Sequence, residues 1–153
     1  MRSYLTILAL LTLISCGDRP TSTQAPTVDT TTVTARTDVT KAATYCFQQV
    51  TGRDSIMARL VVNGADVTGE LTVLLDGKDQ ARGLIRGRLT GNQIRSDWQR
   101  SGEGVTQPHE VTFTMTGDRL SWYEGERVEK QGKWVLKNPN GGFQYVLTKT
   151  DCP

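Results

Sequence analysis

The stretch IRGRLTGNQIRSDW, from Ile85 to Trp98, carries the clearest structural signal in this chain of 153 residues. Gly91-Asn92 has the composition of a two-residue hairpin turn. With the turn there, large apolar residues face each other in the pairs Leu89–Ile94 and Ile85–Trp98. The small residues Gly87 and Ser96 also face each other, which allows close approach or strong bending. The stretch therefore predicts an antiparallel hairpin with one buried face.

The same alternation of apolar and polar residues continues over most of the chain after Tyr45. It recurs in the segments 56–62, 67–75, 111–115, 120–122, 134–136 and 143–147. Turns rich in Gly, Asn and Asp separate these segments, and we predict no helix. About nine short strands indicate an all-β antiparallel meander over residues 45–153, closed or nearly closed into a lipocalin-like barrel. A two-sheet β-sandwich is the alternative.

Two of the three cysteines bracket the predicted barrel. Cys46 lies in the first predicted strand, and Cys152 follows the last one. An even pair of cysteines in an exported chain predicts a disulfide, with two free buried thiols as the alternative. The bond would bring the first and last strands together, as a closed barrel without exposed edges requires.

The third cysteine, Cys16, ends an N-terminal targeting segment. Arg2 precedes an apolar run from Tyr4 to Ile14, which is too short to cross a bilayer. The run closes on Leu13-Ile14-Ser15-Cys16, which resembles the bacterial lipobox. The resemblance implies a signal peptide over residues 1–15, cleavage after Ser15 and diacylglycerol on Cys16. An ordinary signal peptide with a chance cysteine is the alternative.

Residues 16–44 are predicted to be a lipidated cysteine followed by a disordered stalk. From Gly17 to Thr44 the chain is rich in Thr and has no aromatic residue and no Leu, Ile or Met, so it cannot bury a core. Gly17, where a retention signal would have Asp, favours the outer membrane, with the lipid as the membrane contact. The formal net charge of +2 provides no strong field for nucleic acid.

A search for catalytic residues finds little. His109 is the only histidine, and no second His follows it at helical spacing, so we predict no metal and no cofactor. No Gly-x-Ser-x-Gly elbow and no free cysteine nucleophile are present, and we predict that the protein is not an enzyme. His109 is interpreted as a strand residue near the barrel mouth. The charged stretch from Glu124 to Lys130 is interpreted as a solvated loop, so its carboxylates are not assigned an acid–base role.

Two groups of side chains are candidate binding residues. The first shares the outer face of one hairpin and would bind an anionic partner such as a lipid head group or glycan: Arg82, Arg86, Arg88 and Arg95. A charged, soluble surface is the alternative for this group. The second points inward by parity and would line a small apolar cavity: Trp98, Trp122 and Trp134. A barrel filled by its own side chains is the alternative for the tryptophans.

The order of short motifs resembles a family of small uncharacterised outer-envelope lipoproteins of Bacteroidetes-type bacteria. The motifs are Cys46, Gly69-Glu70-Leu71, Lys78-Asp79, Gly83-Leu84-Ile85-Arg86-Gly87, Gly91-Asn92, Ser101-Gly102-Glu103-Gly104, Glu110-Val111-Thr112-Phe113, Lys137-Asn138-Pro139 and Asp151-Cys152. The chain departs from the pattern at Gly102, which interrupts an expected Ser-Glu-Gly. The resemblance implies an envelope location and an all-β fold, and it transfers no catalytic or binding residue.

Three functions fit these features. The first is a non-enzymatic envelope lipoprotein, a binding or structural module for an unknown envelope protein, glycan or lipid. The second is a carrier of a small apolar ligand, which a barrel cavity would favour. The third is an inhibitor of the lysozyme-inhibitor type, which a filled barrel with a protruding Ser101–Pro108 loop would favour.

Overall fold

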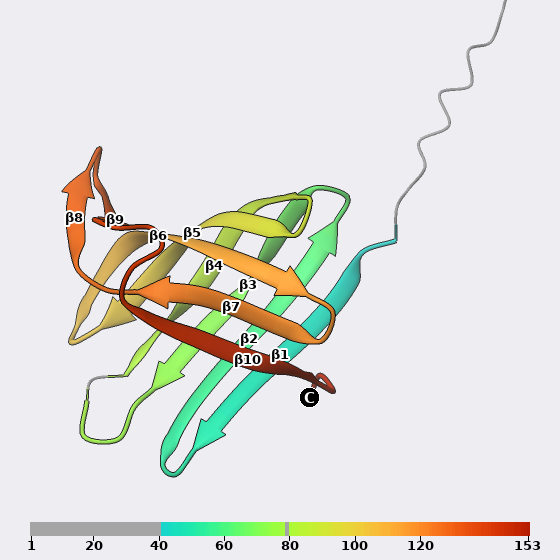
Figure 1. Ribbon diagram of the computed structural model, residues 1–153, viewed down its shortest axis with the longest axis horizontal. Coiled ribbons are helices and arrows are strands. Elements are labelled where there is room, and N and C mark those ends of the chain that lie inside the picture. Colours follow the sequence, from blue (N-terminus) through green and yellow to red (C-terminus); the bar gives the residue numbers. More distant parts are fainter. Residues whose placement is uncertain (1–40, 79) are drawn as a thin grey trace, which may run out of the picture. The chain divides into compact units, whose positions relative to one another are not determined.

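The computed structural model describes residues 41–78 and 80–153, which form ten strands and no helix (Figure 1). The strands are β1 (Ala43–Thr51), β2 (Asp54–Asn63), β3 (Asp66–Leu74), β4 (Ala81–Thr90), β5 (Gln93–Gly102), β6 (Val105–Thr116), β7 (Arg119–Glu124), β8 (Arg127–Lys130), β9 (Lys133–Leu136) and β10 (Phe143–Thr150). The predicted signal peptide, Cys16 and the predicted stalk up to residue 40 lie outside the described residues.

Eight of the strands close into an antiparallel barrel, and two lie outside it. Neighbouring strands follow the order β1-β2-β3-β4-β5-β6-β7-β10, and β10 pairs with β1 through Cys46 and Thr150 to complete the ring. The prediction of an antiparallel barrel is confirmed, and the β-sandwich alternative is excluded. The order departs from a simple meander at one point, because β8 and β9 leave the barrel between β7 and β10.

The predicted hairpin is present with the predicted register. The β4–β5 pairs include Leu89–Ile94, Ile85–Trp98, Gly87–Ser96, Arg88–Arg95 and Arg86–Asp97. A Cβ atom on Gly87 would lie 2.6 Å from the Cβ of Ser96, so glycine is required at this close approach. The Ser96 hydroxyl donates a hydrogen bond to the Val111 carbonyl at 2.9 Å, which allows its burial without an unmet polar group.

Part of the hydrophobic core lies at one end of the barrel, which we call the closed end. The turns at Gly64, Gly91 and Gly117 lie here, and the chain enters β1 here, as the right side of Figure 1 shows. The largest buried side chains near these turns are Leu60, Val67, Ile94, Phe113, Leu120 and Leu147. Each comes from the inward parity of its strand, so the alternation seen in the sequence accounts for this half of the core.

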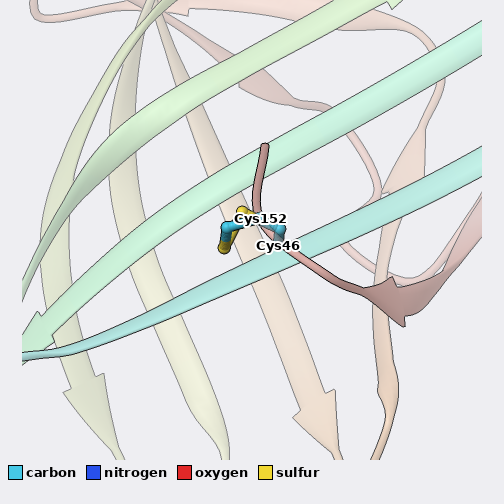
Figure 2. Close-up of a disulfide and its surroundings, with 2 residues drawn as sticks. All are labelled: Cys46 and Cys152. Carbon is cyan, nitrogen blue, oxygen red and sulfur yellow. A yellow bond between two sulfur atoms is a disulfide. The ribbon is translucent and has the colours of Figure 1, made fainter.

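The disulfide between Cys46 and Cys152 is present, with a Cα–Cα distance of 5.2 Å (Figure 2). It joins β1 to the segment that follows β10 and spans 106 residues of chain. Cys46 is buried although it has outward parity, so the C-terminal segment covers it. The predicted pairing is confirmed, and the alternative of two free thiols is excluded.

Two details differ from the sequence predictions. The stretch predicted as a mixed-charge loop contains β8, which forms a hairpin with β9, so the described strands number ten and not nine. This hairpin joins the barrel through one parallel bridge between His109 and Trp134. The first strand begins at Ala43, which pairs with Val62, so residues 43 and 44 belong to the sheet and not to the predicted stalk.

Candidate functional site

The end of the barrel opposite the chain's entry into β1 contains a cavity, and we call it the open end. The β1–β2, β3–β4 and β5–β6 turns surround it, on the left side of Figure 1. Two adjoining chambers of about 540 Å³ each lie inside this rim. Their walls share four side chains, namely Leu75, Lys78, Glu124 and Tyr145. Each chamber falls within the range of roughly 300–1,000 Å³ that is typical of small-molecule sites.

Strand parity determines which side chains reach the cavity. One chamber contains Trp98 and Trp122, and we call it the tryptophan chamber. It is lined on one side by inward residues of β4, β5, β6 and β7, namely Ala81, Trp98, Arg100, His109 and Trp122. The other chamber, which we call the Asp54 chamber, is lined by residues of β1, β2 and β10, namely Gln49, Asp54, Ile56 and Phe143. Two of the three tryptophans predicted to line a cavity, Trp98 and Trp122, therefore do so.

Aromatic rings form much of the wall. The Trp122 and Tyr145 rings are stacked, with centroids 5.0 Å apart and an interplanar angle of 29°. The Trp98 and His109 rings meet edge to face, with centroids 6.1 Å apart. Phe143 contacts Tyr145 edge to face at 4.8 Å and extends the aromatic surface to the exposed rim. These contacts hold the rings in fixed orientations, so the wall is formed before any ligand arrives.

Three buried polar atoms in this half of the barrel have no hydrogen-bond partner among the described residues. They are Trp98 Nε1, His109 Nδ1 and Gln49 Oε1. An unpaired buried polar atom costs about 1–3 kcal/mol, and most native structures contain few of them. Trp98 and His109 line the tryptophan chamber, and Gln49 lines the Asp54 chamber. The three atoms themselves are covered by protein, so the unpaired groups lie within the wall of the cavity.

Arg127 braces the wall of the cavity where β6 and β7 separate. The two strands pair only from Thr114 to Thr116 on β6, so the rest of β6 lacks β7 as a neighbour. The Arg127 guanidinium fills this gap by donating to the carbonyls of Glu110 on β6 and Trp134 on β9, at 3.0 and 3.1 Å. It also donates to both carboxylate oxygens of Glu124, at 2.7 and 3.0 Å.

This arrangement contradicts the prediction that the stretch from Glu124 to Lys130 is a solvated loop. The Arg127 side chain is only 8% exposed, and Glu124 contributes to both chambers. The stretch looks solvated in the sequence because its charges are mixed. The separation of β6 and β7, which depends on distant residues, creates the buried position that Arg127 occupies.

His109 is held in its neutral form. Burial, followed by the positive charges of Arg127 and Arg100, lowers its pKa to about 4, against a smaller opposing effect of Glu124. Burial and the nearby carboxylates of Glu124 and Asp54 raise the pKa of Tyr145. At neutral pH the site therefore presents an uncharged imidazole and an uncharged phenol. His109 lies near the mouth as predicted, although β6 begins four residues before it at Val105.

The four outer arginines occupy the predicted face, and two of them have acidic partners. Arg88 pairs with Asp66 at 3.2 Å, and Arg95 pairs with Glu110 at 3.1 Å. Within residues 41–78 and 80–153, Arg82 and Arg86 have no ion pair. Both are exposed on β4. Because two of the four arginines are neutralised, this face matches a charged, soluble surface better than an anion-binding site.

Two other predicted features have a different environment from the one expected. Trp134 lies on β9 outside the eight barrel strands, with its ring 6.4 Å from that of His109, and it does not line either chamber. The segment Ser101–Pro108 is not a protruding loop. Its residues continue the β5–β6 pairing to Gly102 and Val105, and only the turn at Glu103 and Gly104 is unpaired.

Sequence reasoning missed four residues of this site: Gln49, Arg100, Arg127 and Tyr145. Parity was the available signal for three of them. Arg100 lies two residues after Trp98, and Tyr145 lies two before Leu147, so each shares the inward face of its neighbour. No comparable signal identified Arg127, because its environment depends on the position of β9.

No family model, no curated protein and no solved structure matches this chain. The described residues include no helix long and apolar enough to cross a membrane. They also include no group of three or more His, Cys, Asp or Glu residues arranged to hold a metal ion.

Proposed function

We propose that this protein is a lipid-anchored envelope lipoprotein whose barrel binds a small ligand at its open end. The observation that carries the proposal is the pair of adjoining chambers of about 540 Å³, lined by aromatic residues, with three buried and unpartnered polar atoms in the residues of their walls. A cavity was the feature expected of a ligand carrier. The alternative of a purely structural module gives no reason for buried polar atoms to gather in one half of the barrel.

The lipid anchor is supported by the lipobox at Leu13-Ile14-Ser15-Cys16 and by the Thr-rich stretch behind it. The disulfide fits an oxidising compartment such as the periplasm or the cell surface. Gly17 after the cysteine favours the outer membrane, and the likeness to Bacteroidetes-type lipoproteins points to the same location. The strand β1 begins at the closed end, on the opposite side of the barrel from the cavity (Figure 1).

The anchor is tested by labelling with radioactive palmitate in a bacterial host that lipidates proteins. The wild-type protein should carry label and remain with the membrane fraction. The Cys16→Ser variant should carry none, because the thioether cannot form without the thiol. Equal labelling of the two proteins would overturn the anchor.

Ligand binding is tested with N-phenylnaphthylamine, a neutral aromatic compound whose fluorescence rises in apolar surroundings. Wild-type protein should bind it saturably. Leu75→Trp should weaken binding about tenfold or more, because Leu75 lines both chambers and a larger ring would occupy them. Leu84→Trp is the matched control, since Leu84 is exposed on the outer face of β4. Binding that survives Leu75→Trp unchanged would refute a cavity site.

A further inference from the structure

Some ionised groups of the cavity have an ion-pair partner in the described residues, and others have none. Glu124 is already neutralised by two hydrogen bonds from Arg127. Arg100 lines the tryptophan chamber, and no carboxylate within residues 41–78 and 80–153 forms an ion pair with it. Lys78, at the boundary of the two chambers, likewise has no ion pair in that part of the chain. A ligand in the tryptophan chamber would therefore meet the cations of Arg100 and Lys78, with the carboxylate of Glu103 on the same wall.

Arg100 is also positioned by the aromatic wall. Its guanidinium carbon lies 5.9 Å from the centroid of the Trp98 ring, a cation–π distance. The contact places the guanidinium of Arg100 beside the indole of Trp98. A planar guanidinium held in this way matches the two oxygens of a carboxylate or sulfonate. The positive charge of Arg100 also reaches His109, whose pKa it lowers.

The rest of the chamber suits a flat apolar body. The stacked rings of Trp122 and Tyr145 and the indole of Trp98 line the chamber from β5, β7 and β10, and the two tryptophans are each 3% exposed. Flat rings gain more from such walls than a flexible chain does, because they lose less conformational freedom on binding. The unpartnered atoms Trp98 Nε1, which can only donate, and His109 Nδ1 lie buried in the wall of this chamber.

We infer that the ligand is a small planar anion, with an aromatic or similarly flat body among the tryptophans and one carboxylate or sulfonate on Arg100. This inference rests on the proposed binding function and specifies the chemical class of its ligand. Three carboxylates also line the cavity, those of Asp54, Glu103 and Glu124. Asp54 lies in the other chamber, where it accepts a hydrogen bond from the Asp76 backbone at 2.7 Å. Glu103 lies on the turn between β5 and β6.

The test uses two fluorescent compounds with the same aromatic skeleton. Anilinonaphthalene sulfonate carries an anionic group, and N-phenylnaphthylamine carries none. Wild-type protein should bind the sulfonate at least about tenfold more tightly, and added salt should reduce only that preference. Arg100→Gln should abolish the preference and leave the affinity for the neutral compound within about twofold, whereas Arg100→Lys should retain part of it.

Arg82→Gln is the matched control, because it removes the same charge from the exposed outer face of β4. It should leave both affinities unchanged. If both compounds bind with equal affinity and Arg100→Gln affects neither, the anion preference is wrong and the proposed function stands. If Arg100→Gln weakens the binding of both compounds equally, Arg100 contributes to the shape of the chamber and does not recognise the negative charge of the ligand. If neither compound binds, the proposed function fails, and the inference fails with it.

The flat body is tested separately by displacement of the bound sulfonate. Naphthoate should displace it at least about tenfold more effectively than dodecanoate, which carries the same carboxylate on a flexible chain. Equal or better displacement by dodecanoate would overturn the planar part of the inference and would indicate an acyl-chain ligand.

Discussion

The guanidinium of Arg127 and the carboxylate of Glu124 form a two-point contact, at 2.7 and 3.0 Å, that joins β8 to the wall of the cavity. The same guanidinium donates to the carbonyls of Glu110 and Trp134. One side chain thus connects β6, β7, β8 and β9 where the barrel strands separate. The open end of the barrel depends on this contact, because no strand fills the gap that Arg127 occupies.

Replacing Arg127 with Met is expected to destabilise the protein by about 2 kcal/mol. The change leaves Glu124 without its partner and two backbone carbonyls without donors. The figure stands below the usual range for a fully buried pair because the Glu124 side chain is 36% exposed and partly solvated. Urea unfolding of the two proteins measures the difference.

The exposed pair between Lys137 and Glu126 is the control for that experiment, since it joins the same region at 3.0 Å. Lys137→Met should cost no more than about 0.5 kcal/mol, because both side chains are solvated. Equal losses for Arg127→Met and Lys137→Met would contradict the bracing role of Arg127.

The disulfide is expected to contribute up to about 4 kcal/mol to the free energy of unfolding. Cross-linking over 106 residues removes many conformations from the unfolded chain. The double variant Cys46→Ala/Cys152→Ala should therefore unfold at a clearly lower urea concentration than the oxidised wild type. Reduced wild-type protein should behave like the variant. Indistinguishable midpoints for all three samples would show that closure of the barrel does not depend on this bond.

His109 should make the protein less stable as the pH falls from about 6.5 toward 4. Its pKa is about 4 in the folded state against 6.5 as a model value, so over this range the unfolded chain binds a proton that the folded chain does not. The free energy of unfolding should fall by about 2 kcal/mol from this group between pH 7 and pH 4.5.

His109→Gln separates this effect from that of the carboxylates, which titrate in both proteins. The variant should lose less stability than wild type between the two pH values, by about those 2 kcal/mol. Urea titrations at each pH give the comparison. A parallel decline of the two proteins would mean that the imidazole is not held neutral by its surroundings.

The sequence predicts much of this fold because local pairing leaves a readable pattern. The register of the β4–β5 hairpin follows from Gly91-Asn92 and from the alternation around it, and all the predicted pairs are present. Trp98 and Trp122 are correctly placed by the same rule. Trp134 follows the same alternation, yet it lies on β9, outside the barrel. The alternation does not indicate whether a strand joins the barrel.

The candidate site is less predictable for a physical reason. Parity tells which side chains point inward, but whether they meet across the barrel depends on how the strands tilt and separate. At the closed end the inward residues Phe113 and Leu147 fill the space. At the open end β6 and β7 diverge, so the inward residues Trp122 and Arg100 surround a cavity. Neither outcome is visible in a single strand.

The three tryptophans allow the binding site to be located by the shifts of their indole N–H signals in nuclear magnetic resonance spectra. On addition of N-phenylnaphthylamine, the signals of Trp98 and Trp122 should move saturably, because both rings line the tryptophan chamber. The signal of Trp134 should move far less, since that ring lies outside both chambers. Assignment by single Trp→Phe variants identifies each signal. Signals that all stay in place, or a shift confined to Trp134, would contradict a ligand site inside the barrel.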